Sequence, residues 1–166
     1  MKTIITILTL WICFGCTSVK KELDNGRYKQ AVSLAVSKLK GKKNKSPKFV
    51  LGLEEAYEYY LQEKLTQAED LKRKSAAGTD LQLLKIYEEI ESVQASIRPL
   101  LPLTDKNGYR AYIQLMDVSA ELARYRNKAA DYLYASALEN LEKGNKGNKS
   151  AARQAYKELK EMEGIA

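Results

Sequence analysis

The sequence predicts an all-α fold with about five helices in antiparallel hairpins. Over most of the 166 residues, apolar side chains recur at steps of three and four, which is the period of an amphipathic helix. Glycine and proline separate these stretches, and no segment has a convincing strand pattern. The length suggests one domain, and the 45% hydrophobic and 30% charged content is that of a folded protein. Whether the helices form a bundle or a short solenoid stays open.

The first two predicted helices cover residues 27–40 and 47–74. In the first, apolar residues from Tyr28 to Leu39 share one face, and Gly41 ends the helix. Ser46 and Pro47 supply an N-cap and a first-turn proline for the second helix. Its apolar stripe consists of Val50, Leu53, Tyr57, Leu61, Leu65, Ala68 and Leu71.

The third predicted helix follows a cap at Thr79 and ends before Pro99, because the residue before a proline avoids the helical region. Residues 98–103 are then expected to form an extended connector whose leucines pack against the helices. Asp105 to Gly108 is a predicted turn. Residues 109–116 alternate between apolar and polar side chains, so they are either extended or the start of a helix.

The last two predicted helices form a hairpin. The fourth helix is expected from Val118, with its apolar face running to Leu141, and Gly144 and Gly147 break it. The final helix is expected from about residue 150 to 163, with Ser150 as its cap.

The N-terminal segment has the order of a secretory signal. Lys2 is followed by an apolar run from Ile4 to Phe14, which is too short to span a bilayer, and then by Gly15-Cys16. A cysteine after a small residue resembles the lipobox of bacterial lipoproteins, although Cys13 and Phe14 depart from the usual pattern. The resemblance implies that residues 1–15 are removed and that Cys16 is acylated. An uncleaved hydrophobic anchor is the alternative, and both interpretations hold the chain to a membrane.

The predicted organisation is therefore a signal at residues 1–15, a tether at 16–21 and one helical domain at 22–166. Basic residues are concentrated where this domain begins. Residues 20–48 contain ten Lys or Arg and two acidic residues, whereas residues 49–166 have a net charge of −2. A lysine cluster is defined by Lys38, Lys40, Lys42, Lys43, Lys45 and Lys48.

Three interpretations of the lysine cluster are considered. Contact with an anionic membrane surface is one, since each Lys there contributes about 1 kcal/mol. A solvated loop between helices is the second. Nucleic-acid binding is the third, and it is disfavoured because no aromatic residue interleaves the lysines to stack on bases.

The residue types disfavour catalysis, metal binding and cofactor binding. The chain has no His, and its two Cys lie within the first 16 residues, which removes the usual zinc ligands and general bases. The glutamates are expected on solvated helix faces. The run from Gly144 to Ser150 lacks the spacing of a phosphate-binding loop and follows no strand. The sequence thus predicts a protein that is not an enzyme and carries no cofactor or metal.

Eleven tyrosines offer a different kind of surface. Tyr57, Tyr59 and Tyr60 cover more than one face of the second helix, so not all of them can be core residues. Because tyrosine is enriched at protein interfaces, Tyr59 and Tyr60 are the predicted partner surface. Helix–helix packing is the alternative use of these side chains.

Two further resemblances concern the helical domain. Gly26-Arg27-Tyr28-Lys29-Gln30-Ala31 resembles the middle of a tetratricopeptide repeat, and Gly147, Ala152 and Tyr156 repeat part of that spacing. The resemblance implies paired helices joined by glycine turns. The combination of Gly26-x-Tyr28, the 98–103 connector, 129–134 and 152–156 also resembles the N-terminal part of uncharacterised envelope lipoproteins. Members of that group continue into further domains, so a truncated or minimal form is expected here.

The leading prediction is a lipid-anchored, non-catalytic protein of the bacterial envelope, on the periplasmic side or the cell surface. Its helices would bind another protein or a cell-wall component, and acylated Cys16 would hold it to the membrane. A tethered spacer with no ligand of its own is the alternative. A hydrolase that works through carboxylates alone is a third and weaker hypothesis.

Overall fold

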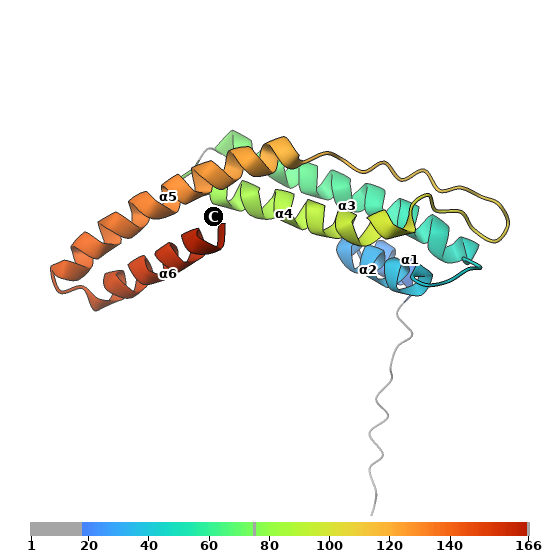
Figure 1. Ribbon diagram of the computed structural model, residues 1–166, viewed down its shortest axis with the longest axis horizontal. Helices are drawn as coiled ribbons and strands as arrows, with labels where there is room; N and C mark the ends of the chain where they lie inside the picture. The colour runs from blue at the N-terminus through green and yellow to red at the C-terminus, as the bar shows by residue number, and fades with distance from the viewer. Residues whose placement is uncertain (1–17, 75, 166) are drawn as a thin grey trace, which may run out of the picture.

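The computed structural model describes residues 18–74 and 76–165, and those residues form six α-helices and one short 3-10 helix (Figure 1). The helices are α1 (Val19–Asp24), α2 (Tyr28–Leu39), α3 (Pro47–Lys74), α4 (Thr79–Ile97), α5 (Ser119–Asn145) and α6 (Lys149–Ile165), with η1 at Arg98–Leu100. Among these residues there is no strand, and an isolated bridge joins Thr104 and Arg110. The predicted all-α class is confirmed.

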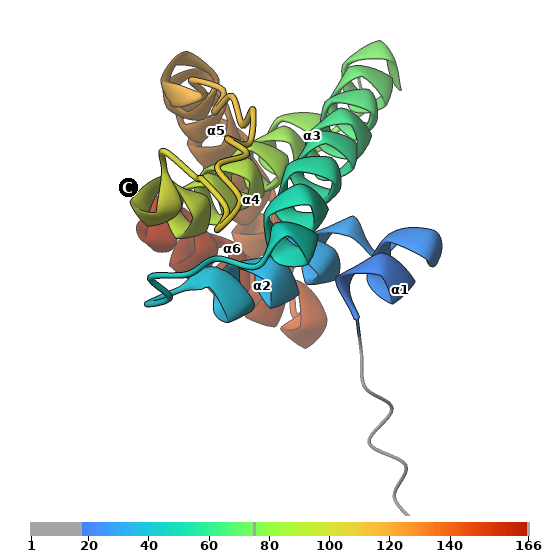
Figure 2. The same ribbon diagram turned by 90° about the vertical axis from the view of Figure 1, so that its right-hand side faces the viewer.

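The helices are arranged as an elongated array in chain order. α1 and α2 lie against one end of the long α3–α4 pair, and the α5–α6 hairpin extends beyond the other end (Figure 1). α3 and α5 both pack on α4 but diverge from each other, which leaves a V-shaped arrangement with α4 at its base (Figure 2). The C-terminal end of α6 returns to α4, where Lys85 and Glu161 form an ion pair at 2.6 Å.

The core follows the predicted stripes. The first half of the α3 stripe is buried, and so are Leu83, Ile90 and Ile97 of α4. On α5 the buried face runs from Tyr125 to Ala137. Leu61 and Leu65 of α3 are half-buried at the edge of this core.

α1 is a helix that the sequence analysis missed, since residues 19–21 were assigned to the tether. Ser18 caps it by accepting a hydrogen bond from the backbone N–H of Lys21 at 3.1 Å. Buried Glu22 pairs with Arg27, whose hydrogen bond lowers the pKa of that carboxyl. Val19 is fully buried against α3, so the tether cannot extend to residue 21 as predicted.

The connecting segments correct three further predictions. Residues 98–100 form η1 rather than extended chain, although Leu103 is buried as expected. Residues 109–116 are extended, which settles the alternative left open. The cap of α6 is Asn148 rather than Ser150, because its Oδ1 accepts hydrogen bonds from two backbone N–H groups of the first turn. Gly78, with a positive φ of 78°, precedes α4 in place of the predicted Thr79 cap.

The structure contains both glycine turns that the tetratricopeptide resemblance implies, but the alanines at the two matching positions differ in burial. Gly26 and Gly147 both have positive φ, at 68° and 98°, in the turns that join α1 to α2 and α5 to α6. Ala31 is buried in α2, whereas Ala152 is exposed and its neighbour Ala151 is buried instead. The solenoid type therefore stays a prediction.

Candidate functional site

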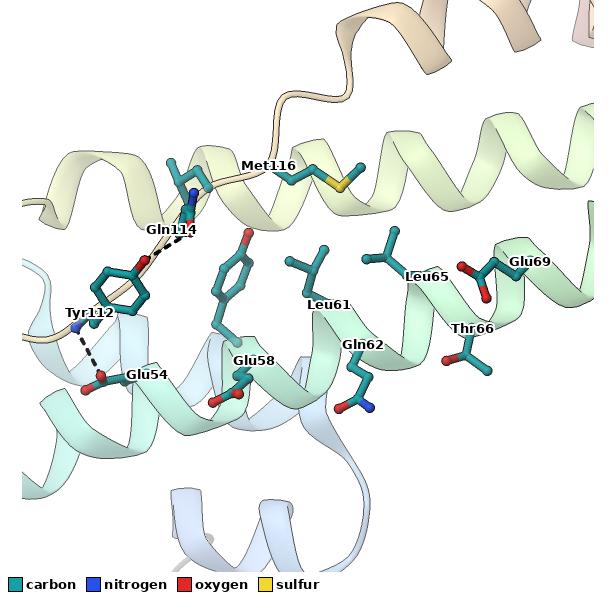
Figure 3. A pocket seen from close by; sticks show the side chains of 12 residues that line it. Glu54, Glu58, Leu61, Gln62, Leu65, Thr66, Glu69, Tyr112, Gln114 and Met116 are labelled. Atoms are coloured by element: carbon teal, nitrogen blue, oxygen red, sulfur yellow. Dashed lines mark hydrogen bonds between the residues drawn. The ribbon is translucent and has the colours of Figure 1, made fainter.

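A cleft lies between α3 and the extended segment that leads into α5. We call residues 109–118 the connecting segment and the cleft beside it the α3 cleft (Figure 3). The cleft has a volume of about 720 Å³. Its lining comprises Glu54, Tyr57, Glu58, Leu61, Gln62, Leu65, Thr66 and Glu69 of α3 with Tyr112, Gln114, Leu115 and Met116 of the connecting segment.

One end of the connecting segment is fixed to α3 by Glu54. The Tyr109 hydroxyl donates a hydrogen bond to Oε2 of Glu54 at 2.8 Å, and the backbone N–H of Tyr112 donates to Oε1 at 3.0 Å. The hydrogen bond to Glu54 raises the pKa of Tyr109 because the protonated phenol is the donor. Glu54 thus acts as a structural clamp as well as a wall of the α3 cleft.

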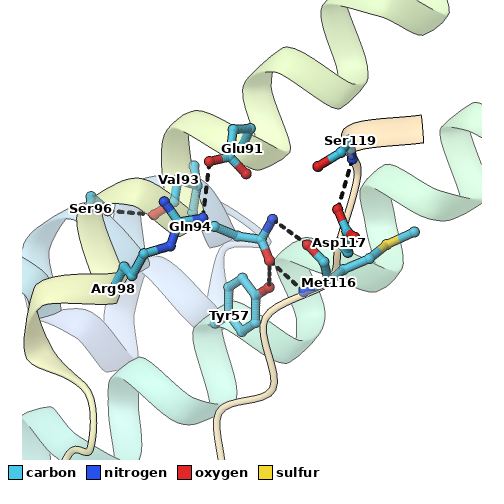
Figure 4. A network of polar contacts seen from close by, with 9 residues as sticks. All are labelled: Tyr57, Glu91, Val93, Gln94, Ser96, Arg98, Met116, Asp117 and Ser119. Atoms are coloured by element: carbon cyan, nitrogen blue, oxygen red, sulfur yellow. Dashed lines mark hydrogen bonds and ion pairs between the residues drawn. The ribbon is translucent and has the colours of Figure 1, made fainter. Parts of the chain in front are cut away.

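The other end is fixed by Gln94, a fully buried residue of α4 (Figure 4). Its Oε1 accepts hydrogen bonds from the Tyr57 hydroxyl at 2.9 Å and from the backbone N–H of Met116, and its Nε2 donates to the Met116 carbonyl at 3.0 Å. Burial raises the pKa of Tyr57. The amide satisfies polar groups that would otherwise be buried without partners, so it locks the connecting segment onto α3 and α4.

The turn into α5 continues this polar network. Asp117 accepts a hydrogen bond from the backbone N–H of Ser119 at 3.0 Å, and hydrogen bonds from Ser119 lower the pKa of Asp117 (Figure 4). A carboxylate at this position also suits the positive end of the α5 dipole. The connecting segment is therefore fixed at both ends before α5 begins.

The α3 cleft combines an apolar floor with an acidic rim. Leu61, Leu65 and Met116 supply apolar surface, while Glu58 and Glu69 are exposed at the edge (Figure 3). No Lys or Arg is part of the lining. Such a surface suits a ligand with apolar and cationic groups. Within the described ranges, no group of three or more His, Cys, Asp or Glu could hold a metal ion.

The lysine cluster surrounds the link between α2 and α3. Lys38 is in the last turn of α2, Lys48 is in the first turn of α3, and all members but the half-buried Lys45 are exposed. The backbone N–H of Lys106 donates to the Lys45 carbonyl at 2.9 Å. This contact brings a further exposed lysine to the cluster, and nothing in the local sequence could have indicated it.

The start of the described chain lies at the same end of the molecule as the lysine cluster (Figure 1). Val19 packs directly on Gly52 of α3, where a Cβ would come within 2.8 Å of the Val19 Cγ1. Gly52 is one helical turn from Lys48. Cys16 lies outside the described residues, and so does the predicted signal at residues 1–15.

The structure separates the two tyrosines of the predicted partner surface, because one is exposed and the other is buried. Tyr59 is exposed and stacks on Tyr28 with ring centroids 5.3 Å apart. Tyr60 is fully buried, so its assignment to a partner surface is wrong. Burial raises the pKa of Tyr60, and its hydroxyl has no hydrogen-bond partner within the described part of the chain. Adjacent helical residues point about 100° apart, so Tyr60 lies on the buried side of α3 while Tyr59 lies on an exposed side.

No helix in the described ranges is long and apolar enough to cross a bilayer. Comparisons with models of known protein families, with curated proteins and with solved structures find no match to this chain.

Proposed function

We propose that this chain is a lipid-anchored, non-catalytic scaffold of the bacterial cell envelope that binds a protein or cell-wall partner. Three features support the proposal together: the lipobox-like pattern at Cys16, the lysine cluster, and the α3 cleft. Tetratricopeptide-like pairing of the helices, with turns at Gly26 and Gly147, is part of the same proposal.

The packing of Val19 on Gly52 carries the proposal, because it would hold an anchor at Cys16 close to the lysine cluster. Cys16 and Val19 are three residues apart, which corresponds to at most about 11 Å of extended chain. An acyl group on Cys16 would therefore hold this end of α3 about one Debye length from the bilayer. At that distance each Lys of the cluster gains about 1 kcal/mol from an anionic surface.

The α3 cleft would remain accessible in this orientation. Glu69, at the far end of the cleft, is 21 residues beyond Lys48 on the same helix, or about 30 Å along its axis. A partner could therefore contact the cleft while the lysine cluster faces lipid. This separation favours a scaffold over a spacer, because a spacer needs no preformed cleft.

Metabolic labelling with a fatty-acid analogue tests the anchor. The two cysteines provide a matched pair, since the proposal places Cys13 in the removed signal and Cys16 at the acylated position. We expect the label to persist in Cys13→Ala and to be lost in Cys16→Ala. Equal labelling of both variants would contradict the proposed anchor.

Site-specific photo-crosslinking in cells tests the scaffold. A photo-reactive residue at Gln62, on the cleft rim, is expected to capture a partner, whereas one at Glu139 on the distant α5 is not. The same crosslinked product from both positions would point to random collisions. Absence of a product at Gln62 would favour the spacer alternative.

A further inference from the structure

We propose that the α3 cleft binds an extended peptide that carries lysine or arginine side chains. This inference rests on the proposed scaffold function and names the chemistry of its partner. Three features of the cleft support it: the charge of the rim, the apolar floor, and the free backbone groups of Gln114 in the connecting segment.

The charge of the rim selects a cationic partner. Glu58 and Glu69 are exposed on α3 at the cleft edge, and neither carboxylate forms an ion pair or hydrogen bond with another described residue. Glu54 adds a third carboxylate at the closed end, although both its oxygens already accept hydrogen bonds. With no cation in the lining, the cleft complements basic side chains and repels acidic ones.

The floor of the cleft requires apolar contacts as well. Leu61 and Leu65 continue the buried stripe of α3 but are half-exposed here, and Met116 faces them from the connecting segment (Figure 3). Methionine adapts its shape to different apolar partners. In an extended peptide with alternating apolar and basic residues, the apolar side chains could contact this floor while the basic side chains contact the glutamate rim.

The backbone of the connecting segment favours an extended partner over a helical one. In an extended chain, residues two apart present their backbone groups on the same edge, so Gln114 faces the edge used by Tyr112 and Met116. Glu54 accepts a hydrogen bond from the backbone N–H of Tyr112, and Gln94 bonds both the N–H and the carbonyl of Met116. Within the described structure, Gln114 forms no backbone hydrogen bond, which leaves one donor and one acceptor for a peptide strand.

The site is preformed and large enough for this partner. The hydrogen bonds of Glu54 and Gln94 hold the connecting segment in place. Peptide binding therefore does not include the free-energy cost of ordering this segment. The volume of about 720 Å³ falls in the range of about 300–1,000 Å³ that is usual for ligand sites. An extended segment of a few residues fits that space.

Fluorescence anisotropy with the full-length chain in non-ionic detergent tests the proposal. The probe is a labelled hexapeptide of alternating lysine and leucine, and the matched probe has glutamate in place of lysine. We expect saturable binding of the lysine peptide alone. Glu58→Gln and Glu69→Gln should each weaken binding about two- to five-fold, as expected for exposed charge pairs.

Matched variants separate the cleft from general acidity. Glu139→Gln and Glu142→Gln remove the same number of charges from exposed positions on α5, and they should leave binding unchanged. Methylation of the peptide backbone nitrogens should weaken binding without altering its charge. Equal loss in the α3 and α5 variants, or full competition by spermidine, would overturn the proposal, since neither requires an extended peptide.

The test is independent of the anchor and scaffold tests. If Cys16→Ala loses its lipid label and Gln62 captures a partner while the lysine peptide fails to bind, the peptide proposal is wrong and the scaffold stands. If the peptide binds but Cys16 carries no lipid, the lipid-anchor part of the proposed function fails.

Discussion

Replacement of Gln94 by Leu is expected to destabilise the fold strongly. The side chain is fully buried, and its amide makes three hydrogen bonds with the Tyr57 hydroxyl and both backbone groups of Met116. Leucine has a similar size but can form none of them. At about 1 kcal/mol per hydrogen bond, Gln94→Leu costs about 3 kcal/mol of unfolding free energy.

Calorimetry measures this effect directly. For a chain of this length, 1 kcal/mol corresponds to a shift of about 2–4 °C, so the unfolding midpoint should fall by about 6–12 °C. Hydrogen exchange at the Met116 amide should accelerate as well, because its acceptor is lost. Gln62→Leu provides the control. The side chain of Gln62 is exposed on α3 and forms no hydrogen bond with another described residue, so this substitution should cost less than about 0.5 kcal/mol.

A double-mutant cycle checks the mechanism. Tyr57→Phe removes the hydroxyl that donates to Gln94, so it should cost about 1 kcal/mol by itself and less in the Gln94→Leu background. A midpoint shift below about 2 °C for Gln94→Leu would refute the reasoning. Full additivity of the two substitutions would show that the hydroxyl and the amide are not coupled.

Three further outcomes follow from the structure. Burial alone would raise the pKa of Glu158, but hydrogen bonds from three neutral side chains outweigh that effect, so the pKa is lowered and the ionised carboxylate stabilises the fold above its unfolded pKa. This stabilisation is lost as the pH falls through the folded pKa, so the stability advantage of the wild type over Glu158→Gln in urea titrations should shrink between about pH 6 and pH 3. A constant difference between the two proteins would contradict this. Gly52→Ala should cost about 1–3 kcal/mol by urea unfolding because the new methyl group meets Val19, and Val19→Ala should restore part of that loss if the clash is the cause. Tyr60→Phe should raise the thermal midpoint or leave it unchanged because the buried hydroxyl has no partner among the described residues; a fall of several degrees would reveal a lost hydrogen bond.

The long helices could be predicted because their signals are local. Pro47 sets the start of α3, and the apolar period of the α4 stripe together with Pro99 sets the end of α4 within a residue. α1 was missed because six residues carry too little periodicity to indicate a helix. It packs on α2 and α3, and the burial of Val19 against Gly52 is one of these tertiary contacts.

The candidate site was beyond sequence reasoning for a related reason. Leu61 and Leu65 belong to the predicted apolar stripe of α3, and the sequence could not indicate that this part of the stripe would line a cleft. Glu54 was expected on a solvated face, yet it holds a segment 55 to 58 residues further along the chain. Tyr60 was assigned to the surface because the apolar period of α3 does not show which of its faces other helices will cover.

The sequence by itself determined the helical class, the positions of the long helices, the lysine-rich link and the lipobox-like N-terminal pattern. Each depends on neighbouring residues, whose spacing fixes backbone hydrogen bonding and local charge. Tertiary structure decided which faces are covered, how Gln94 and Glu54 clamp the connecting segment, and where Lys106 lies. Those contacts join residues far apart in the chain, and their geometry is set when the helices pack as a whole.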